Sequence, residues 1–363
     1  ADHPVTLRVI AEVAAGDADD PEMPAGTAVR IMTGAPVPTA ASAVIPIEVT
    51  QIAADFSNDS GEHNTRANPE ADAWNAAVIR VQQPVILGAN VRQRGEDIRK
   101  GEPIAQAGDE LSAVRLSALA AAGINQVPVH RAPRIAVLST GSELQAIGNQ
   151  LRRGQIPESN SLLIAGLLCE SGFAVTTIDH CADSAEELNH RFALLAATHD
   201  AIITTGGVGP GKYDVVRIAL AKEPEIVSTR VAIRPGQPQC SGRHSAGAFI
   251  FGLPGNPVSA AVSFELFVRP ALLRMAGHSR IDRRTLIATA ETGWSGKTGS
   301  LQVLPITITS TAAGLSCTPS VPANAVSHSV ARHGASQGYA LLGPERGQVL
   351  AGDLVEVIET GTG

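Results

Sequence analysis

The sequence is poor in aromatic residues and in cysteine, and it contains no long apolar run. Phe, Trp and Tyr together supply 3% of the 363 residues, so aliphatic side chains and Ala must fill the core. Because a membrane-spanning helix needs about 18 or more consecutive apolar residues, the sequence predicts no membrane segment. Scattered cysteines without a close pair argue against a disulfide framework or a zinc knuckle, and they favour a reduced, cytoplasmic protein. The four are Cys169, Cys181, Cys240 and Cys317.

A basic excess and a secretion signal are missing as well. The chain carries 28 Lys and Arg against 35 Asp and Glu, a formal net charge of −7 at pH 7. Since the phosphates of nucleic acids select basic protein faces, this balance predicts no nucleic-acid partner. The first residues, Ala1-Asp-His-Pro4, form no signal peptide and lack an initiator Met, so we expect a processed or trimmed end. The length suits two to four domains.

The sequence pattern of the first hundred residues predicts a small β-rich domain, which we place at residues 1–97. Residues 55–75 are polar and lack apolar periodicity, which predicts a loop or hairpin. A helical linking segment is expected over residues 98–132, where the Ala- and Leu-rich residues 111–122 predict a helix that ends at Gly123. Short β-branched runs separated by Gly, Pro or Asp predict the strands of the β-rich domain. They are residues 5–10, 28–32, 43–47 and 77–81.

Residues 133–278 alternate between apolar runs and helical patterns, which predicts a central α/β domain on a parallel sheet. Ser184 and Glu187 form a capping box at one helix start. Asn256 is expected to cap the last helix, with Pro257 at its first position.

Short strands return after the α/β domain and predict a C-terminal β-domain over residues 279–363. Pro270 is expected to break or kink the last helix before it. The predicted fold is therefore an α/β domain between two β-rich domains, with a short helical segment after the first. The C-terminal strands include residues 286–288, 301–304 and 354–358.

Three of the apolar runs end in glycine-rich turns: Ser139-Thr-Gly141, Thr204-Thr-Gly-Gly-Val-Gly-Pro-Gly211 and Gly252-Leu-Pro-Gly-Asn-Pro257. Ligands bind where the carboxyl ends of parallel strands meet helix starts. Glycines there let backbone N–H groups approach an anion, and helix N-termini add partial positive charge. We therefore expect the three turns to share one edge of the sheet and to bind a phosphate-bearing ligand. Four residues mark that edge: Ser139, Gly206, Gly207 and Asn256.

Three acidic residues near the expected site each allow two interpretations. Asp214 either caps the following helix or holds a divalent cation through its oxygens. Glu143, expected in the first turn of a helix, either complements the helix dipole or serves the site. Asp97 lies in a charged run that forms either a solvated face or part of a buried site. His328 and His333 are five residues apart in a Ser-rich segment and are expected at the surface.

Six motifs, in this order, resemble those of the molybdenum-insertion enzymes of molybdenum cofactor biosynthesis, the MoeA proteins and the gephyrin E domain. The resemblance covers nearly the whole chain. It implies a cytoplasmic homodimer whose central α/β domain binds molybdopterin between two β-domains. The motifs span residues 31–38, 94–97, 139–144, 205–214, 234–236 and 252–259.

The resemblance also implies a reaction and a set of site residues. Molybdate and adenylated molybdopterin would react to give molybdenum cofactor and AMP, assisted by a divalent cation such as Mg²⁺. The implied catalytic residues are Asp97, Glu143 and Asp214, of which Asp97 and Asp214 would hold the metal. Together with the turns, the resemblance names the candidate binding residues. They are Thr33, Ser139, Thr140, Gly141, Gly206, Gly207, Gly211, Arg234, Pro254, Gly255, Asn256 and Pro257.

The sequence departs from the family pattern in several charged positions. The family's Ser-Ala-Met-Asp-Gly-Tyr-Ala loop is not found, Ser142 stands where an acid is expected, and Gln237 replaces a lysine. Two hypotheses remain open. One is an active molybdenumtransferase, and the other is a non-catalytic relative that binds a pterin-like ligand or serves as a scaffold. A weaker third, another nucleotide-processing enzyme with the same α/β domain, leaves the motifs at 31–38 and 94–97 without a purpose.

Overall fold

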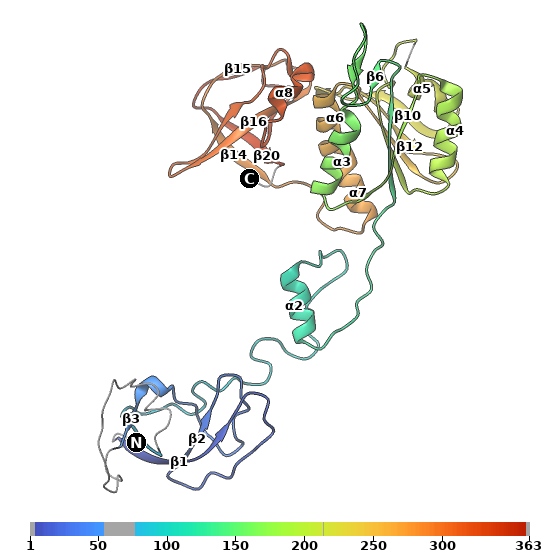
Figure 1. Cartoon of the computed structure of the whole chain (residues 1–363). Coiled ribbons are helices and arrows are strands. Elements are labelled where there is room, and N and C mark those ends of the chain that lie inside the picture. The colour runs from blue at the N-terminus through green and yellow to red at the C-terminus, as the bar shows by residue number, and fades with distance from the viewer. Residues whose placement is uncertain (1–3, 54–76, 213, 361–363) are drawn as a thin grey trace. The chain divides into compact units, whose positions relative to one another are not determined.

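The computed structural model describes residues 4–53, 77–212 and 214–360. Its chain divides into two compact units, Ala1–Pro103 and Ile104–Gly363 (Figure 1). The predicted loop at 55–75 lies outside the described residues.

The N-terminal unit is a four-stranded sheet in the order β2-β1-β4-β3. Strand β1 pairs in parallel with β2 and antiparallel with β4. The predicted strand at residues 43–47 is wrong, because Pro46 leads into a 3-10 turn, Ile47–Val49, instead of a sheet ladder. The other three predicted strands are confirmed. The elements are β1 (Val5–Val13), β2 (Thr27–Ile31), β3 (Thr50–Ile52) and β4 (Val78–Val81).

The predicted helix of the linking segment is α2, Ala113–Ala121. Ser112 caps its start, since the Ser112 side chain accepts a hydrogen bond from the Arg115 amide at 3.3 Å. The chain then turns at Gly123, whose φ of +78° favours glycine. Both ends of α2 are therefore set by local sequence; the glycine end was predicted, whereas the cap at Ser112 was not.

The central sheet has six strands in the order β10-β12-β13-β9-β5-β8. Strands β13, β9, β5 and β8 are parallel, as predicted. The two remaining strands correct the prediction, because β12 runs antiparallel to β13 and β10 antiparallel to β12. A tight turn, closed by a hydrogen bond from the Gly247 amide to the His244 carbonyl, joins β12 to β13. A parallel pair needs a crossover of a dozen or more residues, which this turn is too short to supply.

The central strands differ in character, since β5, β9 and β13 are apolar runs whereas β8, β10 and β12 carry many polar residues. They are β5 (Ile135–Thr140), β8 (Val175–Cys181), β9 (Ala201–Thr205), β10 (Glu225–Arg230), β12 (Pro238–Arg243) and β13 (Phe249–Leu253). Every residue of β5 and β9 is buried, which is the pattern of strands covered on both faces.

Helices cover both faces of this sheet (Figure 1). On one face α3 (Asn160–Glu170), α6 (Pro257–Ser263) and α7 (Arg269–Met275) pack through Ile164, Ala260 and Leu272 among others. On the other, α4 (Ala185–Ala196) and α5 (Val215–Ala219) pack through Phe192 and Val216 among others. Ser184 caps the start of α4 as predicted, since it accepts from the Glu187 amide at 3.3 Å. The Ser184 amide, however, donates to the Ala182 carbonyl at 2.7 Å, so the return bond of a capping box is not formed. Asn256 and Pro257 also occupy their predicted positions at the start of α6.

A π-helical turn, Phe264–Val268, separates α6 from α7. Pro270 is the second residue of α7. Because proline lacks an N–H group and its ring crowds the preceding turn, the local winding changes there without ending the helix. The predicted irregularity is therefore present as a π turn.

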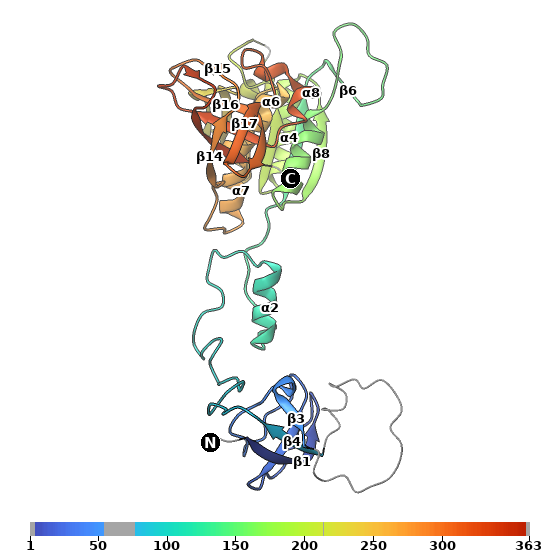
Figure 2. The same ribbon diagram turned by 90° about the vertical axis from the view of Figure 1, so that its left-hand side faces the viewer.

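The C-terminal sheet has the order β11-β16-β17-β14-β20-β18 and is closed by pairing of β18 with β16. Strand β11 comes from the central part of the chain, and Arg234 pairs with Gln302 of β16. A shared cluster of Val262, Val303, Tyr339 and Ile358 packs α6 against this sheet, and Figure 2 shows the C-terminal strands beside the α/β domain. The strands are β11 (Ile233–Arg234), β14 (Thr285–Ala290), β16 (Leu301–Thr311), β17 (Gly314–Pro319), β18 (Gly338–Leu342) and β20 (Leu354–Glu359).

The surface prediction for the two histidines holds for only one of them. His328 is exposed, at the end of a 3-10 turn (Val326–His328). His333 ends the short helix α8 (Val330–His333), is half-buried, and its Nε2 lies 3.1 Å from the Tyr339 hydroxyl. Burial lowers the pKa of His333 below the usual histidine value, because the charged ring loses solvation.

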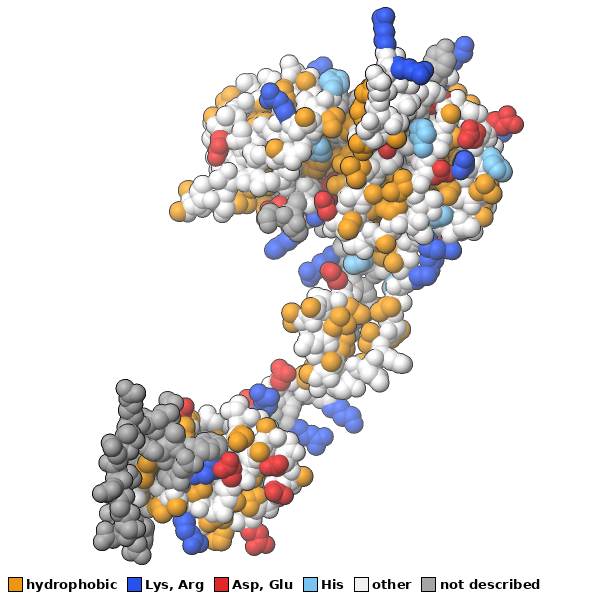
Figure 3. Space-filling view, in the orientation of Figure 1, with side chains coloured by type: hydrophobic (Ala, Val, Ile, Leu, Met, Phe, Trp, Pro, Cys, Tyr) orange, Lys and Arg blue, Asp and Glu red, His pale blue; other side chains and the backbone are white. Residues whose placement is uncertain are grey.

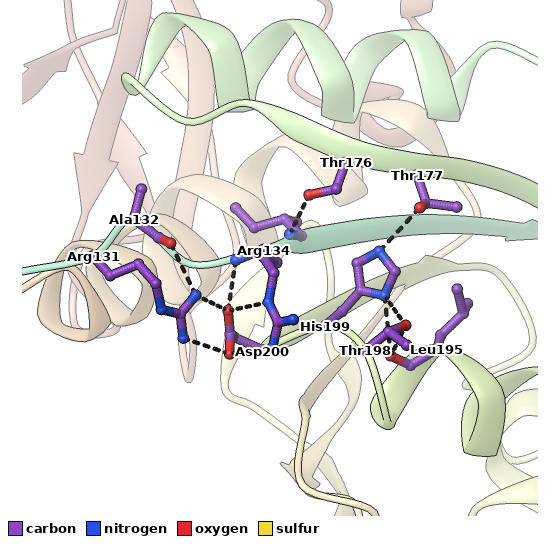
Figure 4. Close-up of polar contacts among 10 residues, drawn as sticks. Arg131, Ala132, Arg134, Thr176, Thr177, Leu195, Thr198, His199 and Asp200 are labelled. Carbon is purple, nitrogen blue, oxygen red and sulfur yellow. Dashed lines mark hydrogen bonds and ion pairs between the residues drawn. The ribbon is translucent and has the colours of Figure 1, made fainter.

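Asp200 anchors the chain at the amino end of β9 (Figure 4). Its carboxylate accepts from Arg131 Nη1 at 2.7 Å and Nη2 at 2.9 Å, and from the Arg134 amide at 2.7 Å. The Arg131 guanidinium lowers the pKa of Asp200 well below its usual range, with the Arg134 amide acting in the same direction. The folded state therefore holds the ionised carboxylate more firmly than the unfolded chain does.

Replacing Asp200 with asparagine is expected to lower the midpoint of thermal unfolding at pH 7 by roughly 2–4 °C. The effect stays modest because solvent screens the exposed Arg131. The depressed pKa stabilises fully above the unfolded-state value of about 4, and this stabilisation declines as the pH falls from there towards the much lower folded-state pKa. Thermal scans from pH 7 to pH 3 should therefore show a constant difference between the two proteins down to about pH 4 and a smaller difference at about pH 3. Asp179→Asn, which breaks a single contact to Arg191, is the control and should cost less.

Candidate functional site

The three glycine-rich turns meet at one edge of the central sheet. Thr205 pairs with Ser139 on one side and with Leu253 on the other, so the three strands end level with one another. The Gly206 amide donates to the Leu253 carbonyl at 3.0 Å, which ties the second turn to the third. The predicted common edge is therefore confirmed.

Close approach explains why glycine occupies these turns. A Cβ on Gly206 would lie 3.0 Å from the Thr140 carbonyl oxygen, and one on Gly255 would lie 3.4 Å from Gly206 Cα. Gly206 and Gly207 also have φ values of +90° and +66°, which L side chains rarely adopt. The backbones of all three turns can therefore pack directly against one another.

A cleft of about 970 Å³ opens beside this edge, between the turns and the C-terminal sheet. Several predicted site residues line it: Gly207, Asp214, Arg234, Pro254, Gly255 and Asn256. The opposite wall was not predicted from the sequence and includes Trp294, Lys297, Gln302, Asn324 and Ser327. Nothing in the short C-terminal strands signals that wall, because it faces the turns only after β11 pairs with β16.

The first turn lies behind the cleft, and its hydroxyls have internal partners. Ser139 Oγ lies 3.1 Å from His180 Nδ1. Thr140 Oγ1 donates to Asp183 at 3.1 Å, and the Ser142 amide donates to the same carboxylate at 2.9 Å. Asp183, which the sequence did not single out, therefore holds this turn in place.

Glu143 is not at a helix start, which corrects the prediction. It lies in a turn that leads into β6 (Leu144–Gln145), a short strand paired with β7 (Ile156–Pro157). The Glu143 carbonyl accepts from the Ile156 amide at 2.9 Å, so the chain makes an excursion before α3 begins at Asn160. No local sequence pattern signals this excursion.

Four candidates shape the backbone of the turns or of the segments next to them. Gly206 and Gly211 lie in the second turn, and Pro257 is the first residue of α6. Gly141 follows β5, and a Cβ there would lie 2.8 Å from Leu144 Cγ. These residues shape the backbone of the turns.

Asp214 organises the second turn. Its carboxylate accepts from the Gly209 amide at 2.7 Å and from the Gly211 amide at 2.6 Å. It stands at the N-cap position of α5 but makes no side-chain capping bond, so the helix-cap interpretation is wrong for its side chain. Arg217 closes the turn from the other side, donating to the Gly209 and Gly211 carbonyls at 2.8 and 3.1 Å.

Two cations and one carboxylate line the cleft, Arg234, Lys297 and Asp214. Gln237, which stands where the family has a lysine, accepts from Arg230 Nη2 at 2.5 Å. This contact brings the Arg230 guanidinium next to the position that has lost a cation. The cleft therefore keeps a positive balance suited to an anionic ligand.

The metal prediction rests on residues in both units. Within the described ranges there is no group of three His, Cys, Asp or Glu side chains that could hold a metal ion. Asp214 lies in the cleft, whereas Asp97 is exposed in a turn of the N-terminal unit. Thr33 also belongs to that unit, in the turn after β2. A shared site for Asp97, Thr33 and Asp214 stays a prediction.

Family comparison accounts for the order of the motifs. Residues 2–123 match the MoeA N-terminal region (domains I and II), and residues 136–274 match the probable molybdopterin binding domain. The chain belongs to the MoeA family. The resemblance seen in the motifs is thereby confirmed, and so is the predicted three-part fold.

Several relatives have known names. The chain is 38% identical over 280 residues to molybdopterin molybdenumtransferase 2 of Mycobacterium tuberculosis, covering 76% of this chain and 63% of that protein. It is 33% identical over 276 residues to molybdopterin molybdenumtransferase of Haemophilus influenzae, with the same two coverages of 76% and 63%. The chain thus spans less than two thirds of the length of these relatives.

A solved structure also matches along the chain. The molybdopterin biosynthesis MoeA protein of Pyrococcus horikoshii superposes with a TM-score of 0.73 at 27% identity, covering 99% of this chain and 82% of that protein. Among the residues described, no helix is long and apolar enough to cross a membrane.

Proposed function

We propose that this MoeA-family chain is a molybdopterin molybdenumtransferase of molybdenum cofactor biosynthesis. It would insert molybdenum from molybdate into adenylated molybdopterin and release AMP. The observation that carries the proposal is the cleft, where two glycine-rich turns and Arg234 face a C-terminal wall that includes Lys297. Its volume of about 970 Å³ suits a ligand as large as an adenylated pterin.

Different residues of the cleft would bind different parts of the ligand. Arg234 and Lys297 are placed to attract the phosphate and molybdate anions, and the amides of the glycine-rich turns can approach the same groups. Trp294 and Leu304 form an apolar stretch of the wall, where a flat pterin ring can pack. These contacts hold the reacting groups together and lower the entropy cost of the transfer.

The Asp214 carboxylate suits a magnesium ion whose other ligands include phosphate oxygens. Asp214 uses one lone pair of each oxygen for the Gly209 and Gly211 amides, which leaves others for a cation. Mg²⁺ is usually held by one or two carboxylates together with phosphates and water. When bound it would neutralise charge on the phosphoanhydride that is cleaved. We assign Asp97 as the second carboxylate, from the N-terminal unit of this or a second copy.

A second copy of the chain is the proposed partner. Exposed apolar side chains on the second unit include Val114 of α2, 80% exposed, and Leu162 of α3, 67% exposed. Figure 3 shows hydrophobic side chains on the surface of α2 and of the α/β domain. Contiguous apolar surface marks association sites. Light scattering should give a molar mass of twice 37.4 kDa, and a value of 37.4 kDa would contradict the homodimer.

Replacing Arg234 with alanine is expected to weaken binding of adenylated molybdopterin by roughly 10- to 100-fold, because a charge-assisted contact is lost. Isothermal titration would measure the affinity, and chromatography would measure AMP released with molybdate and Mg²⁺ present. Arg152→Ala, an exposed position between β6 and β7, is the matched control and should bind like the parent. If the parent protein binds adenylated molybdopterin but releases no AMP, the non-catalytic relative is favoured. If the parent protein does not bind adenylated molybdopterin, a scaffold is favoured.

A further inference from the structure

Two buried carboxamide side chains lie behind the cleft and hold its turns. Asn160, the first residue of α3, is 8% exposed, and Gln239 of β12 is 6% exposed. Burying an amide is costly unless its polar atoms find partners, so each must serve a specific contact. Neither residue belongs to the glycine-rich turns or to the charged groups that line the cleft.

Asn160 holds the third turn. Its Nδ2 donates to the Gly255 carbonyl at 2.7 Å, across 95 residues of sequence. Among the described residues its buried Oδ1 has no partner, so the side chain is retained for its donor group. Gly255 in turn packs on Gly206, and Asn256 after it starts α6. The bond therefore fixes the third turn against the second.

Gln239 holds the turn that carries Arg234. Its Nε2 donates to the Gly236 carbonyl at 2.7 Å and to Ser263 Oγ of α6, also at 2.7 Å. Gly236 has a φ of +99°, and a Cβ there would lie 2.9 Å from Ser263 Oγ. The turn at Gly236 therefore packs directly against α6. The third turn, which Asn160 holds, leads into the start of the same helix.

We propose that Asn160 and Gln239 are positioning residues for ligand binding in the cleft. Each pins the carbonyl of a cleft-lining glycine, so that the turn amides and Arg234 are held in place before the ligand arrives. Preorganised binding groups raise affinity because they need not be ordered on binding. The inference rests on the proposed function for the nature of the ligand, but the loop anchoring is independent of it.

Apolar variants test the anchoring without a ligand. Asn160→Leu and Gln239→Leu each replace the carboxamide, and with it the N–H donors, by an apolar side chain. Hydrogen exchange should speed up at least about tenfold in residues 252–256 of the first variant and in residues 234–237 of the second. The matched control is Gln337→Leu, which removes a carboxamide that accepts from the Ile308 amide in the C-terminal sheet. Exchange in both cleft turns should be unchanged in that control.

Ligand affinity then separates positioning from mere stability. With inorganic pyrophosphate and adenylated molybdopterin as probes, both cleft variants should bind about tenfold more weakly, and Gln337→Leu should bind like the parent. Equal affinity within twofold in the cleft variants, or unchanged exchange in both turns, would overturn the proposal. If the parent binds neither probe, the proposed function fails, and the exchange data alone decide whether the two amides anchor the turns.

Discussion

Replacing Asp214 with asparagine is expected to slow AMP release about a hundredfold or more, with the fold retained. An asparagine side chain offers one acceptor oxygen, so its NH₂ group would oppose the amide of either Gly209 or Gly211. The second turn could not close, and the negative charge available to a cation would be lost. Losing a charge-assisted contact of about 3 kcal/mol corresponds to roughly a hundredfold in rate. Single-turnover AMP release and circular dichroism would measure rate and fold.

Two comparisons identify the role of the carboxylate. Asp214→Glu keeps the charge but lengthens the side chain, so a magnesium titration should restore part of its rate if Asp214 contacts the cation. Ser184→Ala removes a true helix cap on α4 and should cost about 1 kcal/mol of stability with AMP release unchanged. An Asp214→Asn protein with the same profile as Ser184→Ala would show that Asp214 only stabilises the second turn and does not contact the cation.

Replacing Glu265 with alanine is expected to reduce the free energy of unfolding by about 3–5 kcal/mol. Glu265 lies in the π turn with a side chain that is 5% exposed. It accepts from Arg283 Nε at 2.8 Å and Nη2 at 3.2 Å, and Arg269 Nη1 lies 3.8 Å from it. Burial lowers the pKa of Arg269, and the nearby Arg283 acts in the same direction. Without the carboxylate, two partly buried guanidinium groups would repel each other.

Urea unfolding measures this effect, with the midpoint and the slope determined separately. Glu186→Ala is the control, because Glu186 is an exposed acid on α4 and should change stability by less than about 0.5 kcal/mol. Since Glu265 adjoins the cluster that packs α6 against the C-terminal sheet, two separate transitions in the variant would show that it couples the two domains. If Glu265→Ala lowers the free energy of unfolding no more than Glu186→Ala does, the buried ion pairs of Glu265 are not important for stability.

Much of the architecture follows from signals a few residues long. Pro257 starts α6, Ser184 caps the start of α4, and Gly123 follows the end of α2, each as predicted. The glycine-rich turns also meet as expected, because parallel strands joined by right-handed crossovers bring their carboxyl ends together. In these cases the deciding interactions form between near neighbours in the chain, or follow from the handedness of the connections.

The rest depends on contacts between distant segments. The antiparallel edge strands, the excursion at Glu143 and the wall at Trp294 and Lys297 arise from pairings that no local pattern encodes. Asp214 shows the same limit at one residue: local sequence placed it at the N-cap position of α5, yet its carboxylate binds the Gly209 and Gly211 amides instead. Sequence patterns thus located the edge where the glycine-rich turns meet, because turn chemistry is local. The second wall of the cleft forms only when separate strands pack. The orientation of the Asp214 carboxylate is likewise determined in the folded chain, because only there are its hydrogen-bond partners in place.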